Sequence, residues 1–403
     1  LVGMGAFLSH AETYYWAGGD SWNLYSNPDN WRSGSADGDV APSCPGAADS
    51  LGKLPWKNML FDLGGGVGEF GTWDTTADWN AAHLSVSNGT LTAKTLFQTH
   101  SGSLNIWDGG TFVAEGRMNL SVNDATRFNV NVHKGGTVEV QGAFEAFYTG
   151  FYIDAGGLLK FSPTKINLWG NNRPIDFELN GTMEAPAGIR WTEGNQQSLN
   201  FNLNDGGRMV LGGNVSKTVN GSLCFNWNGG TIATTGDVVF ENTVATIPEN
   251  AALVAEVAEG TTLDLSPFTV GEGVSLNKTG AGILRLGSSK FANLSIESGT
   301  LAVGTMFSAN MATFAEGTTV ALSSANASIE FPEIVGSGLT LKFAANGILI
   351  NNLPSAFSNV EFDLSTAIMD IPYLSCLDES SLETIRMKLA AVLPDTQELT
   401  VQG

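Results

Sequence analysis

The chain has 403 residues, with 40 acidic and 19 basic side chains and a formal net charge of -21. Such a charge repels phosphate backbones and anionic lipid surfaces, which argues against nucleic-acid binding. The 49 glycines favour an all-β chain with frequent turns over a helical one. The three cysteines, Cys44, Cys224 and Cys376, lie far apart and predict no disulfide framework.

The N-terminal segment LVGMGAFLSHA has the character of the end of a secretory signal peptide. An apolar core is followed by small residues at the positions that define cleavage. We therefore expect export and a mature N terminus near Glu12, with a buried N-terminal strand as the alternative. No other segment is long and apolar enough to span a bilayer, so no transmembrane segment is predicted.

Residues 12–80 are rich in aromatic side chains and hold six of the ten tryptophans. A β-solenoid needs a terminal unit that covers the open end of its core, and bulky aromatic rings serve that purpose. We therefore interpret this segment as an N-terminal cap. The alternative is a glycan-binding platform in which Trp16, Trp22 and Trp31 stack on sugar rings. Capping is preferred because buried aromatic residues are the commoner case.

Residues 81–372 repeat a glycine step followed by alternating apolar residues, as in GGTVEV at residues 135–140. The pattern glycines Gly136, Gly157, Gly181, Gly207 and Gly230 follow one another at intervals of 21, 24, 26 and 23 residues. Later the units shorten, and Gly282, Gly299, Gly317 and Gly338 are 17, 18 and 21 residues apart. Such intervals fit one turn of a β-solenoid, whereas the strands of a meander or sandwich would turn at much shorter intervals.

Residues 373–403 change character and predict a short helix. Ser380 and Glu383 have the spacing of a capping box, and apolar residues recur at helical intervals from Leu382 until Pro394. We expect this helix either to close the C-terminal end of the solenoid or to lead into a further domain.

The segment GAGILRLGSSKFANLSIESGTLAV at residues 280–303 resembles the autotransporter-associated β-strand repeat. The segment WAGGDSWNLYSNPDNW at residues 16–31 is similar to the start of large secreted bacterial repeat proteins. The resemblance is close over one or two units and implies a right-handed parallel β-helix that is exported and displayed at the cell surface. It departs from the repeat family where residues 291–294, FANL, replace the usual Gly-Gly-Thr centre.

No catalytic residues are expected, and Asp176 and Glu178, which stand two residues apart in DFEL and would share one strand face, are only weak candidates. A pair of carboxylates could support glycoside hydrolysis. We prefer to interpret them as the solvated face of an amphipathic strand. Asp37 and Asp39 are weak candidates for Ca²⁺ binding, because they lack the regular ligand spacing of a calcium loop. No cofactor and no catalytic metal are expected.

The sequence therefore predicts an acidic, exported, parallel β-helix with a structural or adhesive role, acting as a rigid rod that presents loops for contact. Surface glycans or cell-envelope components are the expected partners. One alternative is a carbohydrate-active protein, either a polysaccharide lyase or hydrolase or a glycan-binding module. A second alternative is a self-assembling extracellular fibre subunit, should a strand edge be left unpaired.

Overall fold

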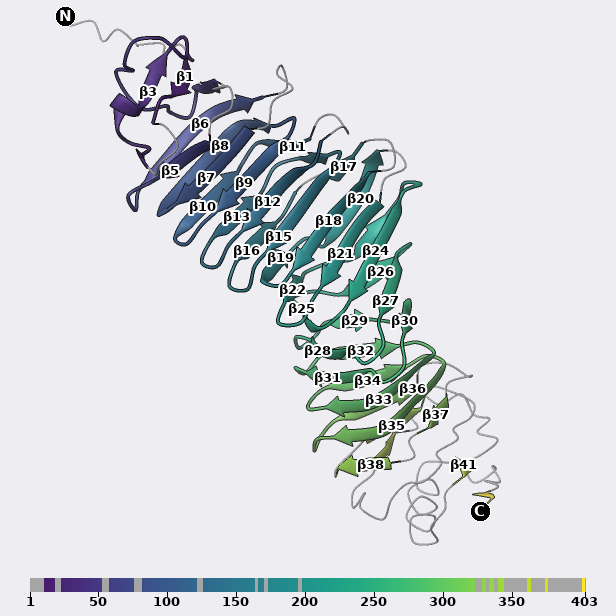
Figure 1. Ribbon diagram of the computed structural model, residues 1–403. Coiled ribbons are helices and arrows are strands. Elements are labelled where there is room, and N and C mark those ends of the chain that lie inside the picture. Colours follow the sequence, from purple (N-terminus) through teal and green to yellow (C-terminus); the bar gives the residue numbers. More distant parts are fainter. Residues whose placement is uncertain are drawn as a thin grey trace, which may run out of the picture. The chain divides into compact units, whose positions relative to one another are not determined.

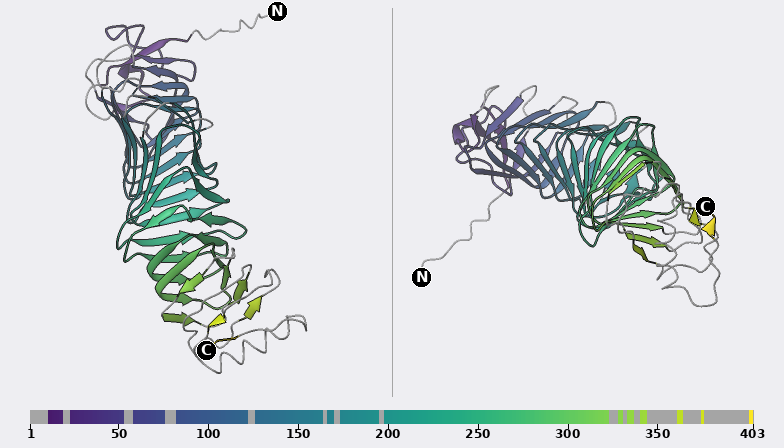
Figure 2. Two further views of the ribbon diagram at one scale, coloured as in Figure 1. Left: turned by 90° about the vertical axis from the view of Figure 1, so that its right-hand side faces the viewer. Right: turned by 90° about the horizontal axis from the view of Figure 1, so that it is seen from below.

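The computed structural model describes residues 11–18, 23–52, 58–75, 82–121, 126–163, 166–169, 173–194 and 198–322, and several short strands beyond them. Parallel sheets form an all-β solenoid of about 11 turns, which confirms the predicted parallel β-helix. The predicted C-terminal helix, Trp22 and residues 1–10 lie outside the described residues. The chain divides into two compact units, each of which consists of stacked turns (Figures 1 and 2).

The first unit comprises Leu1–Ala185, Arg190–Phe201 and Lys217–Leu223. One of its sheets, called the platform sheet below, is entirely parallel and is seen side by side in Figure 1. Its strands are β5 (Asn58–Asp62), β7 (Ala82–Ser87), β9 (Gly102–Ile106), β12 (Phe128–Val132), β15 (Thr149–Ile153) and β18 (Pro174–Leu179).

Two further strand series complete the turns of this unit, and their strands also pair in parallel. The first series is β6 (Val67–Asp74), β8 (Gly89–Gln98), β10 (Gly110–Ala114), β13 (Thr137–Val140), β16 (Leu158–Phe161) and β19 (Thr182–Ala185). The second is β11 (Arg117–Leu120), β14 (Phe144–Ala146), β17 (Ile166–Leu168) and β20 (Ile189–Gly194). Val138 pairs with Leu159 and Leu159 with Met183, so the register reproduces the predicted glycine intervals over these turns.

The N-terminal strands close one edge of this unit. β1 (Thr13–Trp16) lies between β4 (Ser50–Gly52), with which it is parallel, and β3 (Trp31–Ser33), with which it is antiparallel. β2 (Asn23–Leu24) pairs with β5, and η1 (Pro28–Asn30) is a single 3-10 turn that precedes β3. The antiparallel strand occupies an edge that would otherwise offer unpaired backbone groups.

The second unit comprises Pro186–Ile189, Asn202–Ser216 and Cys224–Gly403. The sheet called the groove sheet below consists of β25 (Gly230–Thr234), β28 (Ala252–Glu256), β31 (Ser275–Thr279), β33 (Ser289–Ile296) and β35 (Met306–Phe314), all parallel. A second series is β26 (Val238–Glu241), β29 (Thr262–Asp264), β32 (Ile283–Leu286), β34 (Thr300–Val303), β36 (Thr319–Leu322), β39 (Thr340–Phe343) and β40 (Glu361–Asp363).

The remaining strands are short or lie at the division between the units. They are β21 (Ser198–Leu203), β22 (Arg208–Leu211), β23 (Val215–Lys217), β24 (Ser222–Trp227), β27 (Val244–Ile247), β30 (Phe268–Val270), β37 (Ser328–Glu330), β38 (Glu333–Gly336), β41 (Leu374–Ser375) and β42 (Val401–Gln402).

One predicted turn length differs from the register by a single residue. The step from Thr300 to its strand partner Thr319 is one residue longer than the step between the pattern glycines Gly299 and Gly317. The additional residue is Thr318, which is fully buried and whose hydroxyl donates to the carbonyl of Ala315 at 2.8 Å. A corner can therefore absorb one residue while the strands keep their pairing.

The interior of each turn is filled by the alternate apolar residues of the strands. On the platform sheet Phe151 stacks on Phe177 with a centroid separation of 4.4 Å, and Phe177 stacks on Phe201 of the neighbouring strand β21 at 4.6 Å. Equivalent positions in successive turns thus form continuous columns, because parallel strands lie about 4.8 Å apart. Such columns can stabilise a repeat fold without disulfides.

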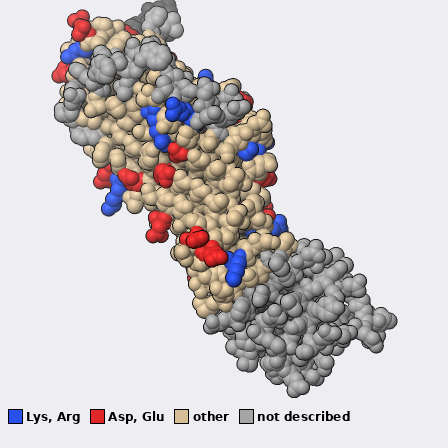
Figure 3. All heavy atoms as spheres, turned by 45° about the vertical axis from the view of Figure 1, so that its right-hand side comes forward, with Lys and Arg blue, Asp and Glu red and all other residues tan. Residues whose placement is uncertain are grey.

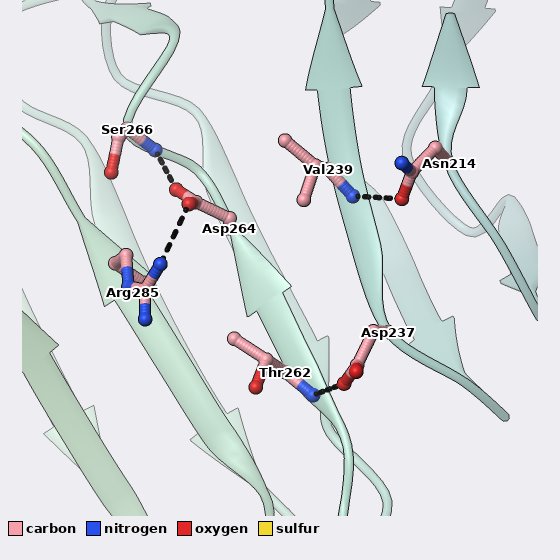
Figure 4. Close-up of polar contacts among 7 residues, drawn as sticks. All are labelled: Asn214, Asp237, Val239, Thr262, Asp264, Ser266 and Arg285. Atoms are coloured by element: carbon pink, nitrogen blue, oxygen red, sulfur yellow. Dashed lines mark hydrogen bonds and ion pairs between the residues drawn. The ribbon is translucent and has the colours of Figure 1, made fainter.

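Some outward carboxylates and amides bind the backbone of another turn, as Figure 4 shows for the second unit. The amide oxygen of Asn214 accepts the N–H of Val239 at 3.0 Å, and the carboxylate of Asp237 accepts that of Thr262 at 2.7 Å. Asp264 accepts the N–H of Ser266 at 2.9 Å and contacts Arg285 at 3.4 Å. These acidic groups therefore support the architecture.

Candidate functional site

Strand β18 carries both candidate catalytic carboxylates on its outer face. Its burial alternates strictly, so that Ile175, Phe177 and Leu179 point into the core while Asp176 and Glu178 are partly exposed. The shared strand face predicted from their spacing is therefore present. Glu178 lies opposite Tyr152 of β15 in the register of the platform sheet.

Both oxygens of Asp176 already accept hydrogen bonds from neighbouring side chains. Oδ2 accepts from Nη2 of Arg127 at 2.7 Å, and Oδ1 accepts from Nδ2 of Asn200 at 2.7 Å. The Asp176 side chain is 19% exposed, and that of Arg127 is 26% exposed. A general acid or base needs an oxygen that can exchange a proton with a substrate. Asp176 instead anchors Arg127 on the sheet.

Arg127 is the centre of a cluster of cationic and aromatic side chains. Its guanidinium carbon lies 5.4 Å from the ring centroid of Tyr148 and 5.5 Å from that of Tyr152. Arg173 approaches the same Tyr148 ring at 5.3 Å. These distances are within the range of cation–π attraction. We call Arg127, Tyr148, Tyr152, Arg173 and Asp176 the arginine–tyrosine cluster.

Gly150 makes room for this cluster. A methyl group at this position would lie 2.6 Å from Nη2 of Arg127 and 2.7 Å from the Tyr152 ring. The guanidinium can therefore lie close above the strand only because the residue beneath it has no side chain. Nε of Arg127 and Oδ1 of the nearby Asn129 are buried and make no hydrogen bond within the described part of the chain. A ligand hydroxyl group has the chemistry to satisfy such a donor or acceptor.

A second group of side chains follows the ends of the same strands. Trp107, His133 and Asp154 come directly after β9, β12 and β15, and thus take the same place in three successive turns. The rings of Trp107 and His133 stack with centroids 4.0 Å apart, and Nδ1 of His133 lies 2.8 Å from Oδ2 of Asp154. Trp107 is 45% exposed, and the register places only the small Ser87 opposite it in the preceding turn. We call these three residues the tryptophan ladder.

Amide and hydroxyl groups lie on the strands between the two groups. Nδ2 of Asn131 donates to Oδ1 of Asn105 at 2.8 Å, and Nδ2 of Asn105 donates to the hydroxyl of Ser103 at 2.9 Å. Parallel pairing places Asn105, Asn131 and Tyr152 at equivalent positions of consecutive strands. The tryptophan ladder, this amide row and the arginine–tyrosine cluster together form what we call the outer platform face.

The tryptophans predicted as a sugar platform lie elsewhere. Trp16 is 0% exposed and Trp31 is 1% exposed, and their rings pack edge to face with a centroid separation of 5.0 Å. Neither indole offers an open ring face, which argues against the glycan-binding prediction for these two residues and suits the interpretation as a cap. The exposed Trp107 was missed, although its outward position could have been inferred by continuing the alternation of GSLNIW.

The two weak calcium candidates, Asp37 and Asp39, are both exposed. Among the residues that the structure describes, no group of three or more His, Cys, Asp and Glu side chains has a geometry that could hold a metal ion. Asp37 and Asp39 are therefore not joined by a third such ligand from the described ranges.

On the face that Figure 3 shows, most atoms of the described residues belong to uncharged residues, and acidic and basic side chains often lie next to each other. Within the described ranges, no helix has the length and apolar character that a membrane crossing requires.

No protein-family model, no curated protein and no solved structure matches this chain.

Proposed function

We propose that this protein is an exported, adhesive β-solenoid that binds glycans through the outer platform face and does not turn them over. The observation that carries the proposal is the tryptophan ladder, in which an exposed indole stacks on a histidine beside a row of amides. The signal-like N terminus supports a place outside the cell or on its surface.

The chemistry of the outer platform face suits sugars. A half-exposed indole offers an apolar ring face to the C–H groups of a pyranose, and planar amides offer both donors and acceptors to its hydroxyl groups. These groups are fixed on a sheet, so little side-chain entropy is lost when a ligand binds. The arginine–tyrosine cluster adds further donors close to the amide row.

The state of Asp176 favours binding over catalysis. A glycosidase needs two carboxyl groups that exchange protons or attack the anomeric carbon. Here one member of the candidate pair is held at both oxygens by Arg127 and Asn200. Protonation of Asp176 would have to compete with both of these contacts.

The proposal predicts a loss of glycan binding when the exposed indole is removed. On a glycan array, Trp107→Ala is expected to weaken binding by about tenfold or more, because it removes the surface on which a sugar ring stacks. A tenfold higher Kd corresponds to a loss of about 1.4 kcal/mol of binding free energy. Trp169→Ala is the matched control, since Trp169 is also exposed in the first unit, at 40%, but lies outside the outer platform face. Equal affinities for Trp107→Ala and wild type would contradict the proposal.

A second prediction concerns Asp176 and turnover. Glycans that bind are expected to keep their length on prolonged incubation with the wild-type protein, and Asp176→Asn is expected to leave this unchanged. Asp176→Asn removes the charge that holds Arg127, so binding is expected to weaken several-fold through displacement of the guanidinium. Chromatography of the incubated polymer measures its length. Shortening by the wild type that disappears in Asp176→Asn would establish an enzyme instead.

A further inference from the structure

A shallow groove crosses the groove sheet of the second unit on its outer side. It has a volume of about 530 Å³ and extends over strands β25, β28, β31, β33 and β35. Its lining comes from two rows of residues that the strand register places at matching positions. One row is Thr231, Val254, Asn277, Ser295 and Thr313, and the other is Ala252, Ser275, Asn293 and Met311.

The two rows carry hydroxyl, amide and apolar groups and no charge. Asp205, near one end, is the single charged residue among those that line the groove. Nδ2 of Asn293 donates to the hydroxyl of Ser275 at 3.0 Å, which leaves its amide oxygen as an acceptor. Nδ2 of Asn277 donates to Glu297 at 2.8 Å, while Oδ1 of Asn277 is buried without a hydrogen-bond partner in the described part of the chain. Met311 is 36% exposed.

We propose that this groove binds one extended chain of a neutral polysaccharide that runs along the two rows, across the strands. Adjacent parallel strands are about 4.8 Å apart, which is close to the length of one sugar unit in an extended chain. The turns of β25, β31, β33 and β35 can then each present a polar group to a sugar, whereas β28 offers the apolar Val254 and Ala252. The site goes beyond the outer platform face, because it lies in the other unit and uses none of the same residues.

Charge decides against ionic polymers. The described lining of the groove has no basic side chain to pair with a uronate or sulfate, and a net charge of -21 repels polyanions over a longer range. A single carboxylate at one end is a poor match for a polycation. Hydroxyl groups, in contrast, can pair with Ser, Thr and Asn side chains in either direction.

Backbone chemistry decides against an extended peptide. Peptides that bind to sheets usually add to an edge, where free N–H and C=O groups complete their hydrogen bonds. The groove lies on the face of a sheet whose strands are already paired on both sides. A peptide placed there would leave part of its own backbone unpaired.

The test uses the full chain carrying Trp107→Ala, so that binding by the outer platform face is weakened and the Ser295→Trp comparison reports on the groove. Xyloglucan, mixed-linkage β-glucan and mannan are the neutral probes, and alginate is the anionic one, each measured by affinity electrophoresis. At least one neutral polymer is expected to retard this protein, and alginate is not. Adding Ser295→Trp, which places an indole in the groove, is expected to weaken that retardation by tenfold or more.

Two further variants make the result specific. Ile283→Trp adds the same bulk on β32, at a position that is 38% exposed and outside the groove, and is expected to leave the affinity unchanged. Asn293→Ala, which adds no bulk, is expected to weaken binding severalfold if Ser295→Trp should fail to fold. Retardation by none of the neutral polymers, or stronger retardation by alginate, would overturn the proposal. Concentration-dependent dimerisation that Ser295→Trp abolishes would show that a second copy of the chain occupies the groove.

Discussion

Replacing Trp31 by alanine is expected to lower the free energy of unfolding of the first unit by about 3–5 kcal/mol. The Trp31 side chain is 1% exposed, and its ring lies 5.0 Å from that of Trp16 and 5.1 Å from that of Tyr25. Its indole N–H also donates to the carbonyl of Tyr25 at 2.8 Å. Truncation would therefore leave both a large cavity and an unpaired buried carbonyl.

Chemical denaturation followed by tryptophan fluorescence measures this effect, and Trp107→Ala is the matched control. Because Trp107 is 45% exposed, its removal is expected to change the free energy of unfolding by less than about 1 kcal/mol. The two variants thus remove the same side chain from a buried and an exposed position. Similar losses in both would show that the packing of Trp31 against Trp16 and Tyr25 does not stabilise the first unit.

Raising the pH from 7 to 10 is expected to stabilise the second unit by up to about 3 kcal/mol through Lys278. This lysine is 0% exposed and points into the solenoid, where Nζ donates to the carbonyls of Gly280 at 2.6 Å and Ser298 at 2.7 Å. Burial lowers the pKa of Lys278 from 10.5 to about 8. In the unfolded chain the ammonium regains its ordinary pKa.

The sign follows from proton binding in the two states. Between pH 8 and 10.5 the unfolded chain holds the Lys278 proton more tightly than the folded protein, so the free energy of unfolding rises with pH. Well below pH 8 both states are protonated and the cost of the buried charge is fully present. Stability is measured by denaturation at each pH for the wild type, Lys278→Met and the exposed control Lys290→Met.

We expect the pH-dependent gain in Lys290→Met to equal that of the wild type, and the gain in Lys278→Met to be smaller by the contribution of the buried amine. Equal pH profiles for the wild type and Lys278→Met would mean that the ammonium is not destabilised by burial. In that case the two carbonyl contacts would fully compensate the loss of hydration.

The turns were predictable because each residue that sets them acts locally. Gly135 and Gly156 have φ angles of +74° and +83°, which a glycine adopts without strain, and so the corners can be located directly in the sequence. Thr318 could not be predicted, since a threonine after a glycine can begin a strand as well as extend a corner. Only the pairing of Thr300 with Thr319 distinguishes the two cases.

The candidate site was less predictable because its parts are far apart in sequence. Arg127 and Asp176 are 49 residues apart in the sequence. They meet because the chain completes two turns of the solenoid between them and returns to the same face. Whether an aromatic ring faces the core or the solvent also depends on the alternation of side chains along its strand. A shift of one residue moves the ring to the opposite face. Trp16 falls on an inward position of β1, whereas Trp107 falls on an outward position after β9.

The most direct test of the binding role is one titration that reports affinity and turnover together. A polysaccharide that the wild type binds is titrated into the wild type and into Trp107→Ala by calorimetry, and the recovered polymer is then sized. We predict a Kd at least about tenfold higher for Trp107→Ala, with the polymer length unchanged in both samples. An unchanged Kd, or a polymer shortened by the wild type, would contradict a non-catalytic glycan-binding role for the outer platform face.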